Sequence, residues 1–336
     1  MSGTVVGKIQ SRARELAPGF VVSLIVAAAA TFLSEHYDAP VMLFALLLGM
    51  SLNFHASDVK CKPGIEFTAR TVLRIGVALL GMRITLEQII GLGWQPVVLV
   101  VGLVVMTILV SVVAAKALGF QRLFGMLTGG ATAICGASAA LALAAALPSH
   151  PQKERAVLFT VIGVSALSTM AMILYPMIAQ WAALSPEQAG VFLGATIHDV
   201  AQVVGAGYSM SPETGDTATV VKLMRVAMLV PVIVVAAMIT RLQGADPSGK
   251  RPPLLPLFAV GFIVLAGVNS TGWVPPLLQS GVNELSRWSL VVAISALGMK
   301  TQLRELAAVG VKPILLMIGE TIFLAALVLL ILRWAW

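Results

Sequence analysis

Charged residues and cysteines are scarce in this chain. Only 11% of its 336 residues are charged and two are cysteine, while 58% are hydrophobic and the mean hydropathy is +0.95. Because soluble domains carry roughly 25% charged residues, this composition excludes a water-soluble fold. Cys61 lies in a basic loop and Cys135 in a glycine-rich apolar segment. Two such cysteines do not form a disulfide framework, so we expect both to be free thiols.

Motifs of enzymes, cofactors and nucleic-acid binding are also missing. The sequence holds no HExxH, GxSxG, paired Asp-rich or phosphate-loop pattern, so we expect neither an intramembrane enzyme nor a cofactor or metal. The pI near 9.7 is compatible with a nucleic-acid partner. The basic residues lie between apolar segments, however, where membrane topology explains them without nucleic acid.

Long apolar segments dominate what is present, and many approach the roughly 20 residues that cross about 30 Å of hydrocarbon. They predict an all-α polytopic membrane protein, one domain over residues 1–336, with about nine to eleven transmembrane helices. We expect the first segment to be retained rather than cleaved as a signal peptide. The segments are 18–34, 40–54, 64–84, 94–118, 121–147, 155–180, 187–208, 214–241, 253–271, 284–300 and 311–335.

Lysine and arginine are distributed unevenly between the loops. If all eleven segments cross, thirteen lie on the side of the N-terminus and four on the other, which predicts a cytoplasmic N-terminus. We expect the membrane itself to be a bacterial inner membrane. Lys153 and Arg155 are the main exceptions. The count becomes fifteen against two if segments 121–147 and 187–208 are re-entrant hairpins. Broken helices that cross are the alternative, and the sequence does not decide between the two.

An internal repeat links distant parts of the chain. Residues 70–102 align without gaps on residues 287–319, with ten identities in 33 positions. In the expected topology the two copies enter the membrane from opposite sides, so they form an inverted repeat, as in alternating-access carriers. Chance similarity of apolar helices is the alternative. The identical pairs that are not leucine or methionine are Arg70/Arg287, Gly81/Gly298, Gly93/Gly310, Pro96/Pro313 and Gly102/Gly319.

The string LTGGATAICGASAALALAAALP runs from Leu127, within segment 121–147, to Pro148 directly after it. Glycine permits close approach of a ligand and breaks in a helix, and a half-helix that starts near Gly136 would present free N–H groups to an anion. The string therefore predicts a substrate cradle, although tight helix packing by small residues is an alternative. The predicted substrate-binding residues of this segment are Gly130, Thr132, Cys135, Gly136 and Ser138.

Segment 187–208 contains GATIHDVAQVVGAG, which places His198, Asp199 and Gln202 within an apolar stretch. A carboxylate at membrane depth is costly and therefore a functional candidate, and a histidine can move a proton near neutral pH. We predict that Asp199 and His198 couple transport to an ion and that Gln202 binds substrate. The alternative for Asp199 is that it caps a half-helix.

Two cations and one acid occur inside later segments. Lys222 and Arg225 are three residues apart and share a helix face. Such cations snorkel to an interface, pair with an acid such as Asp199, or bind an anion; we predict that both bind the substrate. Glu320 is expected either to pair with a buried cation or to be a polar residue of the bundle interior.

The strings GGATAICGASAA, GATIHDVAQVVGAG, VKLMRV and LLGMRITLEQIIGLG resemble the YeiH-type family of bacterial membrane proteins, catalogued as sulfate exporters. The resemblance covers nearly the whole chain. That family is grouped with the cation/proton antiporter and bile-acid-symporter superfamily, so the resemblance implies inverted repeats and irregular segments that meet at mid-membrane around residues 130–138 and 198–202. One departure is that no irregular segment follows 311–335 as 121–147 follows 94–118.

The leading hypothesis is a secondary active transporter of a small anion, sulfate-like or organic, coupled to H⁺ or Na⁺. Its partners would be the anion, the coupling ion and the lipid bilayer, and one helical bundle would move against another. A Na⁺/H⁺-type cation exchanger, in which Asp199 binds the cation, is the first alternative, and a non-transporting membrane protein is the second. The substrate, coupling ion, transport direction and oligomeric state, a homodimer included, remain open.

Overall fold

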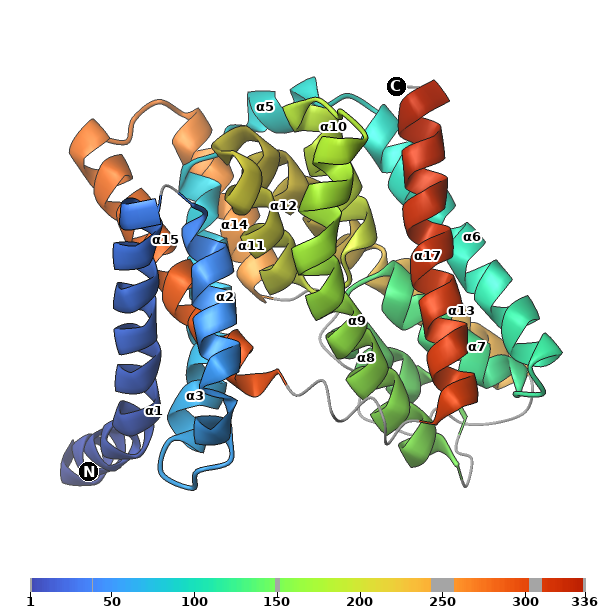
Figure 1. The fold of residues 1–336 in the computed structure, drawn as a ribbon, viewed down its shortest axis with the longest axis horizontal. Helices are drawn as coiled ribbons and strands as arrows, with labels where there is room; N and C mark the ends of the chain where they lie inside the picture. The colour runs from blue at the N-terminus through green and yellow to red at the C-terminus, as the bar shows by residue number, and fades with distance from the viewer. Residues whose placement is uncertain (1, 38, 149–151, 243–256, 302–309, 335–336) are drawn as a thin grey trace. The chain divides into compact units, whose positions relative to one another are not determined.

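The computed structural model describes residues 2–37, 39–148, 152–242, 257–301 and 310–334, and every regular element in these ranges is a helix (Figure 1). The prediction of an all-α membrane protein is therefore confirmed. Within these ranges, five helices are long and apolar enough to cross a membrane, and three shorter apolar helices accompany them. The five long helices are Gln10–Tyr37, Gln95–Ala117, Lys153–Trp181, Pro212–Leu242 and Val311–Trp334.

The chain divides into two compact units. Unit 1 comprises Met1–Ile90 and Leu257–Gln302, and unit 2 comprises Gly91–Pro256 and Leu303–Trp336. In each repeat copy the first part belongs to unit 1 (residues 70–90 and 287–301) and the last part to unit 2 (residues 91–102 and 310–319). Residues 302–309 lie outside the described part of the chain. The repeat itself stays a prediction. Lys250, Arg251 and Arg304 of the charge count also lie outside the described residues.

In unit 1, α15 packs against α1, α2 and α4. The contact between α2 and α15 depends on Gly49 and Gly298, since a Cβ atom on Gly49 would lie 2.3 Å from the Ser295 carbonyl oxygen. The helix backbones therefore touch directly, as small residues allow in membrane bundles. The elements are α1 (Ser2–Tyr37), α2 (Val41–Ser51), η1 (Asn53–Ala56), α3 (Lys62–Phe67), η2 (Thr68–Val72), α4 (Leu73–Leu79), η3 (Leu80–Met82), α5 (Leu86–Gly91), α14 (Leu257–Ser270) and α15 (Pro276–Lys300).

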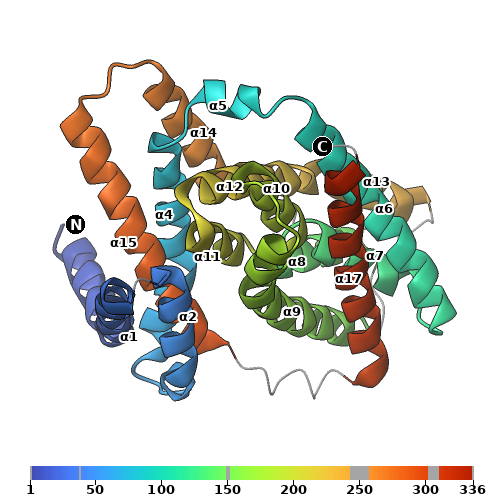
Figure 2. The same cartoon turned by 45° about the horizontal axis from the view of Figure 1, so that its top comes forward.

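Unit 2 contains both segments that were predicted to be irregular. In Figure 2, α6, α7 and α17 lie side by side, and the contacts between them agree. The helical path breaks between α7 and α8 and again between α10 and α11, which confirms the prediction of irregular structure there. The elements are α6 (Gln95–Ala117), α7 (Arg122–Ala133), α8 (Ala137–Ala146), α9 (Lys153–Trp181), α10 (Pro186–Thr196), α11 (Val200–Met210), α12 (Pro212–Ala227), α13 (Leu229–Leu242) and α17 (Val311–Trp334).

The first irregular segment, α7–α8, is a re-entrant hairpin. Leu127 of α7 and Ala144 of α8 line one cavity, together with residues from the start of α9. One turn nearer to the break, a Cβ atom on Gly130 would lie 2.3 Å from Leu143 Cδ1. The two arms therefore run back along each other, and the outer ends of both lie beside the start of α9.

The second irregular segment, α10–α11, is a hairpin of the same kind. The Thr214 hydroxyl at the start of α12 donates to the Pro186 carbonyl oxygen at 3.0 Å, and it accepts from Ser211, which ends α11, at 2.9 Å. The outer ends of α10 and α11 therefore meet. A capping box of Ser185 and Gln188 fixes the start of α10.

The two hairpins enter unit 2 from opposite ends of α9, a continuous helix of 29 residues. The first leads into the start of α9, and the second follows its end. Of the two arrangements that the sequence left open, the structure has the re-entrant one. Lys153 and Arg155 therefore lie at the same end of unit 2 as Arg122, as the fifteen-to-two charge count requires.

Candidate functional site

The tips of the two hairpins touch inside unit 2. His198, in the break between α10 and α11, is fully buried, and its Nδ1 lies 3.0 Å from the Thr132 carbonyl oxygen of α7. Because a carbonyl only accepts, Nδ1 carries the hydrogen. A Cβ atom on Gly136, in the other break, would lie 3.7 Å from the His198 backbone. The structure thus brings together the two segments that the sequence marked as site-bearing.

Lys222 on α12 holds the two tips together. Its side chain is fully buried, and Nζ donates to the carbonyl oxygens of Ile134 at 2.7 Å, Ile197 at 2.9 Å and His198 at 2.5 Å. An ammonium group has three hydrogens. All three are therefore used on the backbone of the breaks, one on the first hairpin and two on the second.

Arg225 lies one turn after Lys222 on α12. It also donates to backbone carbonyl groups, mainly those in the last turns of α7 and α10. Nε donates to Ala133 O at 2.7 Å and Nη2 to Thr132 O at 2.7 Å, both at the end of α7. Nη1 donates to Gly194 O at 3.1 Å and to Ile197 O at 3.0 Å, at the end of α10. The guanidinium therefore donates hydrogen bonds to the last carbonyl groups of both α7 and α10, the first arm of each hairpin.

This placement has a clear electrostatic reason. The last carbonyl groups of a helix lack intrahelical donors and carry about half a negative charge in total. Two such ends meet at the buried breaks, and Lys222 and Arg225 supply both the donors and the compensating charge. The sequence predicted that these cations bind the substrate, with pairing to Asp199 as an alternative. The structure shows their hydrogens on carbonyl groups instead, and their role toward an anion stays a prediction.

The N-terminus of α8 is built differently from these carbonyl ends. Its N-cap is Gly136, with φ +63°, which offers no side chain to the first N–H groups of the helix. Ser138, in the first turn, is exposed, whereas Cys135 is buried. Cys61 and Cys135 are both free, as predicted.

Asp199 and Gln202 occupy the start of α11. Asp199 is half-buried, its carboxylate accepts from Ala201 N at 2.8 Å, and its own N–H donates to Ser168 Oγ at 2.9 Å. It therefore caps the half-helix, which was the alternative interpretation of this residue. Gln202 is buried and donates through Nε2 to Thr169 at 2.8 Å, while Oε1 has no hydrogen-bond partner.

Glu320 belongs to the same cluster, although the sequence did not place it in the site. It lies on α17 with 3% of its surface exposed. It contacts the hydroxyl groups of Ser111 on α6 and of Thr128 and Thr132 on α7. A single acid within an apolar segment was the available signal. Its hydroxyl partners could not be found from the sequence because they come from other segments.

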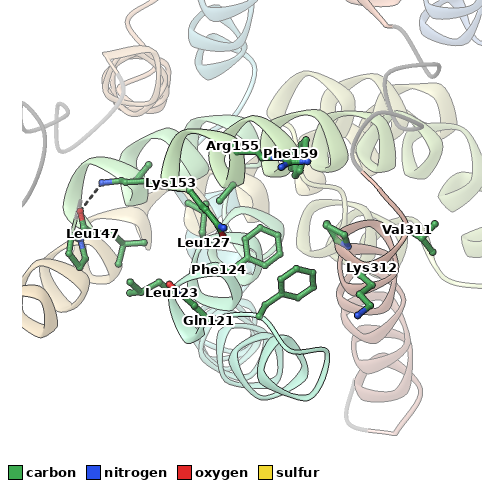
Figure 3. A pocket seen from close by; sticks show the side chains of 16 residues that line it. Gln121, Leu123, Phe124, Leu127, Leu147, Lys153, Arg155, Phe159, Val311 and Lys312 are labelled. Atoms are coloured by element: carbon green, nitrogen blue, oxygen red, sulfur yellow. Dashed lines mark hydrogen bonds between the residues drawn. The ribbon is translucent and has the colours of Figure 1, made fainter. Parts of the chain in front are cut away.

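A cavity of about 460 Å³ lies between the outer ends of the first hairpin and the starts of α9 and α17 (Figure 3). Its walls are mainly apolar, with Leu127, Phe124 and Phe159 among them, and Lys153, Arg155 and Lys312 also line it. Lys153 donates to Leu147 O at 2.8 Å, and the Arg155 guanidinium lies 5.0 Å from the centre of the Phe159 ring. The predicted substrate residues are not in its lining.

These features define a polytopic α-helical membrane protein with two re-entrant hairpins joined at buried cations. The chain belongs to the UPF0324 membrane protein family, and residues 18–317 match the family model described as conserved hypothetical protein 698. It is 56% identical over 314 residues to UPF0324 membrane protein CT0845 of Chlorobaculum tepidum, covering 93% of this chain and 88% of that one. It is 54% identical to UPF0324 membrane protein TauZ of Paracoccus denitrificans, covering 93% of each chain. No solved structure matches.

Proposed function

We propose that this protein is a secondary active transporter of a small anion. The observation that carries the proposal is the meeting of two re-entrant hairpin tips inside unit 2, held by Lys222 and Arg225. Irregular backbone at membrane depth is tolerated where it is buried in protein or lines a cavity, and it recurs at the substrate and ion sites of secondary transporters.

The anion would bind at the N-terminus of α8, around Gly136 and Ser138. Free N–H groups and the positive end of a helix attract anions, by up to about 2 kcal/mol in partly buried sites. Gly136 adds no side chain in front of these N–H groups, and its positive φ of +63° is one that glycine adopts readily. The Gln202 amide and the Cys135 thiol would complete the site, and Gly130, Thr132, Lys222 and Arg225 would support it from behind.

Coupling would involve Asp199 and His198, which stand at the tip of the second hairpin. Proton or Na⁺ binding to the half-buried Asp199 carboxylate would change the charge next to the anion site, so that occupancy of one site alters affinity at the other. Alternating access would follow if one compact unit moved against the other.

A Na⁺/H⁺-type cation exchanger is the second candidate, and one observation favours it. Lys222 and Arg225 use their hydrogens on backbone carbonyl groups, as expected of structural counter-charges. Asp199 would then bind the transported cation. The resemblance to YeiH-type proteins, in contrast, supports the anion carrier and makes sulfate the first substrate to test.

Uptake into proteoliposomes tests both candidates. The purified protein is reconstituted, and uptake of labelled sulfate, sulfite, carboxylates and sulfonates is measured with and without Na⁺ and pH gradients. Gradient-driven uptake of one anion supports the proposal. Na⁺-driven proton flux without any anion supports the exchanger, and no flux under any condition favours a non-transporting membrane protein. The proposal further includes a bacterial inner membrane and a cytoplasmic N-terminus.

A further inference from the structure

Glu320 lies in an unusual environment for a membrane-embedded acid. Its Oε1 contacts Ser111 Oγ and lies 2.7 Å from Thr128 Oγ1, and its Oε2 lies 3.0 Å from Thr132 Oγ1. Among the residues that the structure describes, no lysine or arginine lies within ion-pair distance of it. Its partners are therefore neutral hydroxyl groups alone.

A carboxylate would be poorly compensated here. Removing a charge from water without an opposite charge is costly even after relaxation, and an acid at the centre of a membrane helix is strongly disfavoured on insertion scales. A neutral carboxylic acid avoids this cost and can still form hydrogen bonds with the same hydroxyl groups.

The count of hydrogens around Glu320 also favours the neutral acid. Ser111 Oγ contacts Glu320 and also lies 2.6 Å from the Gly125 carbonyl oxygen. A carbonyl and an ionised carboxylate can both only accept, so the one hydrogen of Ser111 cannot serve both contacts; if it lies on Gly125, both contacts are satisfied only with a protonated Glu320. Thr128 and Thr132 donate to the carboxyl group. The contact between Ser111 and Glu320 then needs a hydrogen from Glu320 itself.

We propose that Glu320 is a proton-binding site, protonated in the conformation described here, with Ser111 accepting the proton's hydrogen bond. A bound metal cation would have to separate the hydroxyl groups from the carboxyl oxygens that they touch. The geometry therefore selects a proton and not Na⁺ as the ligand of this group.

The site is connected to the hairpin tips through two residues. Thr132 gives its hydroxyl to Glu320, while its carbonyl oxygen accepts from Arg225 at 2.7 Å and from His198 at 3.0 Å. Thr321, next to Glu320 on α17, lies 3.0 Å from His198 Nε2. Loss of the proton would create a charge one side chain away from the groups that hold the tips, and would favour a different arrangement of α17 and α7.

His198 and Arg225 are the titratable or charged side chains that reach this network. Within the described residues, α17 packs against α6, α7, α9 and α10, and none of the other ionisable groups of these helices forms an ion pair or a hydrogen bond with Glu320. Those groups are Lys116, Arg122, Lys153, Glu154, Arg155, Tyr175 and Glu187, together with Lys312 and Arg333 of α17 itself.

Infrared spectroscopy of the purified full-length protein tests the proton site directly. We expect a carbonyl-stretching band of a protonated carboxyl group at neutral pH, lost in Glu320→Gln and kept in Glu154→Gln, which removes an exposed acid at the start of α9. Ser111→Ala removes the acceptor but keeps the acid, so the band should move to higher frequency. If Glu320→Gln does not fold, Ser111→Ala still tests the proposal. An identical band in all four proteins, or no such band in the wild type, overturns the proposal.

The use of this proton for coupling rests on the proposed transport function. In proteoliposomes, Glu320→Gln should lose the stimulation of anion uptake by a proton gradient, while Glu154→Gln keeps it. If Glu320→Gln keeps the stimulation, Glu320 does not couple transport although the carrier proposal stands. If the wild type transports no tested anion, the transport proposal fails, and the infrared result still decides whether Glu320 binds a proton.

Discussion

Lys222 and Arg225, one turn apart on α12, divide between them the carbonyl groups that two broken helices leave exposed. The Lys222 ammonium binds carbonyl groups within the breaks, and the Arg225 guanidinium mainly binds the last turns before them. Both side chains are buried. Neither could serve this purpose if the two hairpins did not meet, so the cations and the fold of unit 2 depend on each other.

This dependence predicts a large loss of stability on removal of either cation. A hydrogen bond to a charged group contributes about 1.5–3 kcal/mol, and each variant leaves several buried carbonyl groups without donors. Lys222→Met and Arg225→Met should each destabilise the protein by at least about 3 kcal/mol, which lowers the unfolding temperature in detergent by several degrees. Scanning fluorimetry measures this change.

Lys116→Met is the matched control, because Lys116 is exposed at the end of α6 and should lose less than about 0.5 kcal/mol. If Lys222→Met is as stable as this control yet no longer binds the anion, Lys222 is a substrate ligand and not a clamp on the backbone.

A second prediction concerns Asp199. Asn is as good an N-cap as Asp, so Asp199→Asn should keep the start of α11 and change stability by less than about 0.5 kcal/mol. It removes the charge, however, and should abolish the Na⁺ or pH dependence of uptake in proteoliposomes. Glu187→Gln, at the exposed start of α10, is the control. If the ion dependence of uptake is unchanged in Asp199→Asn, the role of Asp199 is only to cap α11.

The hairpin topology can be tested by labelling. Cysteines introduced at Gln121 and Gln152, in a background without Cys61 and Cys135, should react with an impermeant maleimide from the same side of the membrane, the cytoplasmic one. A cysteine at Glu187 should react from the other side. All three positions are exposed. If the first irregular segment crossed as a broken helix, positions 121 and 152 would be labelled from opposite sides.

The packing of the first hairpin gives a fourth prediction. A side chain at position 130 would collide with Leu143, so Gly130→Ala should cost about 1–3 kcal/mol by overpacking. Leu143→Ala should cost about 2–5 kcal/mol through the cavity that it leaves. In the double variant the new methyl group enters that cavity, so the combined loss should fall short of the sum by at least about 0.5 kcal/mol. Additive losses in thermal unfolding would mean that the arms do not touch there.

The sequence alone determined the fold class and the irregular segments. Hydrophobic runs predict helices because a bilayer leaves every backbone polar group to be satisfied internally. Glycine and polar residues at 129–136 and at 198–205 interrupt such runs. The breaks lie at one end of each range, at residues 134–136 and 197–199. The same local signals marked Asp199, Lys222 and Arg225, since charges inside apolar segments are costly wherever the chain folds.

The tertiary structure decided how these parts combine. Charge counts permitted both broken crossing helices and hairpins, and the contact between Gly130 and Leu143 belongs only to the hairpin. The partners of Lys222 are backbone carbonyl groups, which no side-chain pattern reveals. Ser111 and Glu320 are 209 residues apart in sequence. Such a contact depends on which helices become neighbours, and that is fixed by packing over the whole bundle and not by local sequence.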